Sequence, residues 1–257
     1  SITPWYTRSS ARQLTQANLP QPTWVVTKLR PILQRRDTEL LLNLNTPRVR
    51  MMAGFEDSEK KERDAKLRVV SAVLGEDPQD PEPEWLRAWR RIGDPVAWES
   101  WAVSSYMARL QSMSREIEHT VAYPIRETFR SSPKYFLVFA TRSYKAIPIM
   151  NDILCTEEDD LFAKTETVAK NGQFTLFPAL RDSERVAHLA ALLDEMHAHG
   201  RAHQGCSRPH LIRHFLLQKF GQFKQKHYRQ AMDKLVTDGR ALFANGRAND
   251  VDPISFL

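Results

Sequence analysis

Apolar side chains recur every three to four positions along several stretches of the chain, a spacing that predicts helices. The longest such stretch covers residues 84–120 and contains four of the six tryptophans. Aromatic rows at helical spacing belong to a core more often than to a ligand cage, so we expect a helical region with buried tryptophans. Its apolar positions are Trp85, Leu86, Trp89 and Ile92 and, after Gly93-Asp94-Pro95, Trp98, Trp101, Val103, Tyr106, Met107 and Leu110.

Two shorter runs are typical of strands. Residues 134–142 are aromatic and β-branched between polar flanks, and residues 39–45 form an apolar run between turn-rich segments. An acidic, proline-rich stretch at 75–84 excludes a helix there. A helix is expected over 147–154, ending in the acidic run 157–160, which we interpret as a solvated helix end rather than a cation site.

The last 75 residues follow a different order. Ser183 and Ser207 are expected to cap two helices, the first of which stops at Gly200, and a third helix is expected over 223–236. A turn at Asp238-Gly239, a short strand over 240–244 and a hairpin at Asn245-Gly246 follow. Three helices followed by a hairpin are the pattern of a winged helix-turn-helix domain.

The charge of the chain is concentrated in the same region. The 257 residues include 37 Lys and Arg and 31 Asp and Glu, which gives a net charge of +6. Residues 183–257 hold eleven Lys and Arg and seven Asp and Glu, so +4 of the +6 lies in less than a third of the chain. This asymmetry indicates an anionic partner, and a solvated basic surface is the alternative.

A winged helix usually places its third helix in the major groove of DNA, while its hairpin contacts the backbone. Gln and Arg can read base edges, whereas Lys mostly contacts phosphates. We therefore predict a nucleic-acid partner, favouring duplex DNA, and a binding surface on the outward side of helix three, on the wing and on helix two. The candidate residues are Lys224, Gln225, Lys226, His227, Arg229, Gln230 and Lys234 on helix three, Arg240 and Arg247 on the wing, and Arg208 and Arg213 on helix two.

Several other classes are excluded by composition. The chain is 42% apolar and 26% charged, which argues against disorder, and no apolar run approaches the length of a membrane span. Only 9 glycines are present, and no glycine-rich nucleotide loop or common hydrolase motif occurs. Cys155 and Cys206 do not make a disulfide framework, which favours a reducing cytosol, so we expect a cytoplasmic protein.

Histidines crowd the C-terminal region without a metal-site pattern. A structural zinc site usually needs four ligands at paired spacings, and this region has a single cysteine and no CxxC motif. We interpret the histidines as basic or polar surface residues and predict no bound metal. The residues concerned are His197, His199, His203, Cys206, His210 and His214.

The order of several segments resembles the later half of a known family. The segments are Thr38–Leu44, the Trp-rich middle, Tyr123–Arg126, Lys134–Arg142, Ile147–Ile153 and the basic C-terminal region. Over residues 35–257 they are similar to the three-Cys-motif partner family. The resemblance implies an S-adenosylmethionine-dependent methyltransferase fold joined to a winged helix, and association with a separate protein bearing a three-cysteine motif. It also implies that 39–44 is a late central strand and that 134–141 belongs to a closing antiparallel hairpin.

The family's Asp-x-Phe-Ala-Gly-x-Gly loop and its Asp-Pro-Phe/Tyr-Gly segment are absent here, so no catalytic or cofactor-binding residue is carried over. Either the earlier half lies outside this chain, where S-adenosylmethionine would bind, or the domain has diverged beyond catalysis. The expected fold is α/β, with an incomplete or divergent, helix-rich Rossmann-like portion over 1–182 and a winged helix over 183–257.

Three functions are compatible with these features. The first is a methyltransferase-related protein that the winged helix delivers to DNA. The second is a non-enzymatic DNA-binding or partner-binding module. The third is a structural subunit of a multiprotein complex that docks through its Trp-rich middle.

Overall fold

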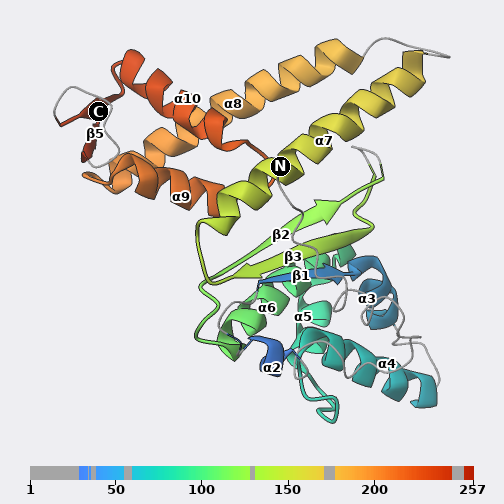
Figure 1. The fold of residues 1–257 in the computed structure, drawn as a ribbon. Coiled ribbons are helices and arrows are strands. Elements are labelled where there is room, and N and C mark those ends of the chain that lie inside the picture. The colour runs from blue at the N-terminus through green and yellow to red at the C-terminus, as the bar shows by residue number, and fades with distance from the viewer. Residues whose placement is uncertain are drawn as a thin grey trace.

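A three-stranded antiparallel sheet separates two layers of helices (Figure 1). The computed structural model describes residues 29–33, 35, 39–54, 60–127, 131–170, 177–244 and 252–257. The first part of the chain contains α2 (Arg30–Leu33), β1 (Leu40–Leu44), α3 (Thr46–Ala53), α4 (Lys60–Leu74), α5 (Glu84–Ile92), α6 (Pro95–Met113), β2 (His119–Ile125) and β3 (Tyr135–Thr141). The second part contains α7 (Ala146–Lys170), α8 (Phe177–Ala202), α9 (Arg208–Gln218), α10 (Gln225–Thr237), β4 (Ala241–Phe243) and β5 (Ile254–Phe256).

The sheet has the order β1-β3-β2, and β3 pairs antiparallel with both neighbours. Side chains alternate between its two faces, as the two-residue period of a strand requires. Val138 and Ala140 of β3 pack with α6, whereas Phe139 packs with α7, α9 and α10. The sheet is therefore covered on both sides, and the C-terminal helices lie on the face opposite α6.

Both strands predicted from the sequence belong to the described sheet. Both predicted strands form, and β2 and β3 make the expected antiparallel hairpin. The segment 39–44, however, pairs only with β3 among the described residues and lies at the edge of the described sheet. Within the described residues it is therefore an edge strand, and the central position that the family resemblance implies stays a prediction. The described residues therefore form a helix-rich α/β fold with a small antiparallel sheet.

The Trp-rich region is core. Gly93 ends α5 in the left-handed conformation, and the Asp94 carboxylate caps α6 by accepting from the Ala97 N–H at 2.7 Å. Trp85 and Trp98 are fully buried, with edge-to-face rings 6.4 Å apart. The Trp85 indole N–H donates to Ser71 Oγ at 2.8 Å, so even its polar atom is satisfied.

The C-terminal part has the expected order of elements. Helices α8, α9 and α10 precede β4 and β5, which pair antiparallel. Ser207, just before α9, forms an isolated bridge with Pro253, and the Ile254 N–H donates to the Cys206 carbonyl at 3.0 Å. The short segment between α8 and α9 thus joins the edge of β5.

Three helix ends differ from the predictions. Helix α7 continues through the acidic run 157–160 to Lys170, so this run is not a helix end. Helix α8 begins at Phe177 rather than at Ser183, which places the predicted domain boundary inside a helix. Gly200 lies within α8, where a Cβ would overlap the Phe256 ring of β5. The missing side chain of Gly200 allows β5 to pack closely against α8, and the helix does not end at this residue.

The turn between α9 and α10 is packed against the sheet. Gly221 has φ +79°, and a Cβ there would overlap the ring of Tyr123 on β2. The buried amide of Asn151, on α7, accepts from the Gly221 N–H at 2.8 Å and donates to the Phe223 carbonyl at 2.8 Å. Residues of the C-terminal helices therefore belong to the same hydrophobic cluster as residues of the sheet.

Replacing Gly221 with alanine should destabilise the fold by about 2–4 kcal/mol. The added Cβ has both a disfavoured positive φ and no room beside Tyr123, and each effect costs about 1 kcal/mol or more. Chemical denaturation of the purified protein measures this change.

The matched control is Gly239→Ala. Gly239 also has a positive φ, of +70°, but nothing lies within 4 Å of its Cβ position, so only the backbone cost of about 1 kcal/mol is expected. Equal losses for the two variants would contradict the packing role of Gly221.

Candidate nucleic-acid interface

One side of α10 is open to solvent and mostly basic. Tyr228, Met232 and Leu235 on the other side are fully buried. The outward side carries cationic and amide groups at helical spacing, with one carboxylate among them. Its exposed residues are Lys226, Arg229, Gln230, Asp233, Lys234 and Thr237. Lys234 forms an i,i+4 pair with Asp238.

Two residues predicted on the outward side of α10 are held elsewhere. His227 is buried, with 8% of its surface exposed, and its Nδ1 accepts from the Lys224 N–H at 3.2 Å. Lys224 precedes the helix and its Nζ lies 3.0 Å from Asp159 Oδ2 on α7. His227 is therefore not on the outward side of α10 as predicted, and Lys224 extends toward α7.

Gln225 is also engaged by α7, but through its backbone. Its N–H donates to Asp152 Oδ1 at 2.8 Å, which satisfies one of the free N–H groups of the helix start. The residue is half-buried. The N-terminal end of α10 is therefore occupied by two carboxylates of the same chain.

Among the described arginines predicted on α9 and on the wing, Arg208 reaches the exposed side of α10. Its Nη2 lies 3.5 Å from Asp233 Oδ1, so the guanidinium reaches across from α9 to the exposed side of α10. This contact also offsets the single carboxylate on that side.

Two other predicted arginines, Arg213 and Arg240, contact residues outside α10. Arg213 donates to His119 Nε2 at 2.9 Å and covers the Tyr144 ring at 4.7 Å, so it faces the sheet. Burial, and then the Arg213 charge, lowers the pKa of His119, which keeps that ring neutral as an acceptor. Arg240 lies 2.9 Å from Asp194 on α8, and Arg247 is outside the described residues.

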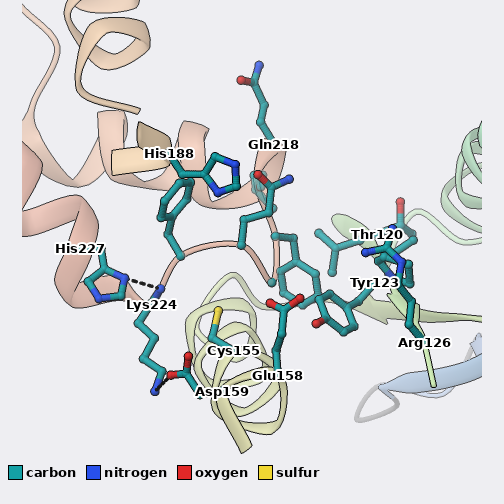
Figure 2. A pocket seen from close by; sticks show the side chains of 18 of the residues that line it. Thr120, Tyr123, Arg126, Cys155, Glu158, Asp159, His188, Gln218, Lys224 and His227 are labelled. Carbon is teal, nitrogen blue, oxygen red and sulfur yellow. Dashed lines mark hydrogen bonds and ion pairs between the residues drawn. The ribbon is translucent and has the colours of Figure 1, made fainter. Parts of the chain in front are cut away.

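A cavity of about 560 Å³ opens at the base of α10 (Figure 2). Its walls are the edge of β2, the α9–α10 turn, α7 and one residue of α8, His188. Lys224 and Asp159 meet on one side of it, and Glu158 points toward Tyr123. Burial raises the pKa of the Cys155 thiol to about 12, so this cavity residue stays protonated and is a poor nucleophile.

The sequence patterns did not reveal the role of α7. Asp152 and Asp159 are seven positions apart, which places them on one side of a helix. This spacing was the one sequence feature that could have predicted a contact between two carboxylates of this helix and the basic third helix. The interpretation of residues 157–160 as a solvated run overlooked the Asp159 pair with Lys224. Asn151, Asp152 and Asp159 are the residues that position the start of α10.

Three histidines form a stack between α8 and α9. The rings of His199 and His214 are 3.9 Å apart, those of His199 and His203 are 4.2 Å apart, and both pairs are nearly parallel. Burial first, and then the neighbouring imidazoles including His210, lowers the pKa of His199 and His214. A Glu195–Lys219 ion pair links α8 to the residue that follows α9. In the described part of the chain, no group of three or more His, Cys, Asp or Glu side chains is arranged to hold a metal ion.

The described residues do not fit the S-adenosylmethionine turn that the family resemblance implies. Such a turn needs a strand followed directly by glycines and a helix. The positive-φ glycines described here, at 75, 93, 205, 221 and 239, all follow helices rather than strands. After β1, Asn45 caps α3 instead, and its side chain accepts from the Arg48 N–H.

Comparisons with protein-family models, with curated proteins and with solved structures find no match. The family resemblance therefore stays a prediction from the sequence motifs. None of the described helices is both long and apolar enough to cross a membrane.

The histidine stack should make stability depend on pH. Because the folded-state pKa of His199 and His214 is lowered, the unfolded chain binds more protons below its own histidine pKa of about 6.5. The stability that the neutral histidines add to the folded state is present above that pH and is lost as the pH falls. We expect the melting temperature to drop from pH 8 to pH 5 more steeply in the parent than in His199→Gln.

The control for this measurement is His188→Gln. His188 is an exposed histidine of α8 with no ring contact in the stack. It should keep the parent's dependence on pH. If His199→Gln melts with the same pH dependence as the parent and the control, the stack has no such role.

Proposed function

We propose that this chain binds duplex nucleic acid, preferentially DNA, with the exposed side of α10 in the major groove and the β4–β5 pair as a wing. The observation that carries this proposal is the row of Lys226, Arg229, Gln230 and Lys234 on the solvent side of the last of three packed helices. A helix of 13 residues is about 20 Å long, which suits the major groove.

The order of elements supports a winged helix-turn-helix. Helix α8 is followed by the Ser207–Pro253 bridge, α9, α10 and the β4–β5 pair, so the segment before α9 joins the hairpin. In this arrangement α9 supports the reading helix and contributes Arg208 beside it. Arg229 and Gln230 have the donor and acceptor groups to read bases, and Lys226 and Lys234 would contact phosphates.

The other predicted functions have less support. Docking through the Trp-rich region would require exposed rings, whereas Trp85 and Trp98 are fully buried and Trp89 and Trp101 are half-buried against the same core. A methyltransferase role rests on the family resemblance, and we propose no catalytic step for the described residues. The preference for DNA over duplex RNA follows from the narrow major groove of A-form helices, which side chains do not enter.

Removing the three cations from α10 should abolish most of the binding. In fluorescence anisotropy with a labelled DNA duplex of about 20 base pairs, the variant Lys226→Ala/Arg229→Ala/Lys234→Ala should bind at least tenfold more weakly than the parent at 100 mM salt. Each lost phosphate contact should also flatten the plot of log K against log salt by about 0.9.

A variant with the same loss of charge far from α10 is the control. Lys60, Lys61 and Arg63 are all exposed on α4, below the sheet in Figure 1. Their replacement by alanine should leave the salt dependence nearly unchanged. Equal losses in the two triple variants would indicate non-specific attraction to the whole chain and would reject α10 as the binding element.

A further inference from the structure

The N-terminal end of α10 is already bound to anionic groups. Asp152 accepts from the Gln225 N–H at 2.8 Å, and Asp159 pairs with Lys224 at 3.0 Å. A helix start attracts anions because its free N–H groups and its dipole both favour negative charge. Each of the two carboxylates therefore takes a position that suits a phosphate oxygen.

These carboxylates are held in place by a buried contact. Asn151, fully buried beside Asp152, bonds the Gly221 N–H and the Phe223 carbonyl of the α9–α10 turn. The start of α10 and this turn of α7 consequently move together. A nucleic acid that approached this end of α10 would meet fixed negative charge.

The ion pair between Lys224 and Asp159 is more exposed to solvent than the contact of Asn151 with the α9–α10 turn. The side chains are 22% and 36% exposed, and both line the cavity at the base of α10 (Figure 2). Solvent reaches this ion pair, whereas it does not reach Asn151. The pair can thus be broken while the packing of α7 on the turn is kept.

We propose that Asp152 and Asp159 are built-in phosphate mimics, and that the Asp159–Lys224 pair is an autoinhibitory contact that keeps Lys224 away from nucleic acid. Third helices of this type usually contact bases with their N-terminal residues. Here that end is closed by α7, and contact is confined to the exposed side that begins at Lys226. The inference rests on the proposed function, since it describes how binding by α10 is limited.

Neutralising Asp159 should therefore strengthen DNA binding. In the anisotropy assay, Asp159→Asn should bind the duplex about three- to tenfold more tightly than the parent at 100 mM salt. Because Lys224 becomes free for one phosphate, the plot of log K against log salt should steepen by about 0.9. The double variant Asp159→Asn/Lys224→Gln should return this slope to the parent value.

Asp160→Asn is the matched control. Asp160 is the next residue of α7 and is exposed, so its replacement removes the same charge without touching Lys224. The slope should stay at the parent value. Lys224→Gln in the parent background gives a second test that does not depend on the folding of the Asp159 variant, and it too should leave the slope unchanged.

Two results overturn the inference alone. One is an Asp159→Asn variant that binds no better than Asp160→Asn, and the other is a Lys224→Gln variant whose slope falls by about 0.9, since Lys224 would then already contact phosphate. Absence of binding by the parent and by every variant at 50 mM salt would overturn the proposed function together with this inference.

Discussion

The arrangement of the C-terminal half depends on one buried side-chain amide. Asn151 uses both its oxygen and its nitrogen on the turn between α9 and α10, in a place that solvent does not reach. A buried polar group left without its partner costs about 1–3 kcal/mol, so this contact tolerates few alternatives. Because the turn is fixed to α7, α10 has one orientation on the sheet, and its basic side faces outward.

The same constraint determines how much of the positive charge is available. Lys224, Arg213 and Arg240 each contact a partner from a distant part of the chain: Asp159, His119 and Asp194. A count of charges along the sequence includes these side chains, although the Asp159 and Asp194 carboxylates offset the charges of Lys224 and Arg240. The basic surface is smaller than the C-terminal excess suggests, and it is centred on the middle of α10.

Local patterns predicted local structure well and long-range contacts poorly. The aromatic spacing of α5 and α6, the run of β3 and the apolar positions of α9 and α10 are properties of single elements, and each element forms where it was expected. The role of Asp159 depends on its contact with Lys224, which lies 65 positions later in the chain. Ser183 has the residue type of a cap, but α8 already begins at Phe177. The periodicity of one helix carries no information about which other helix covers its first turn.

Gly200 has a further consequence for the strand that packs on it. Phe256 occupies the space that a Cβ would fill, whereas its neighbour Ser255 faces the opposite side of β5. A slip of β5 by one residue would exchange these two faces and turn the ring toward solvent. A glycine inside a helix usually lowers helix stability by about 1 kcal/mol relative to alanine. Here that loss of helix stability accompanies a more specific strand pairing, because the space beside Gly200 on α8 accepts the Phe256 ring in only one register of β4 and β5.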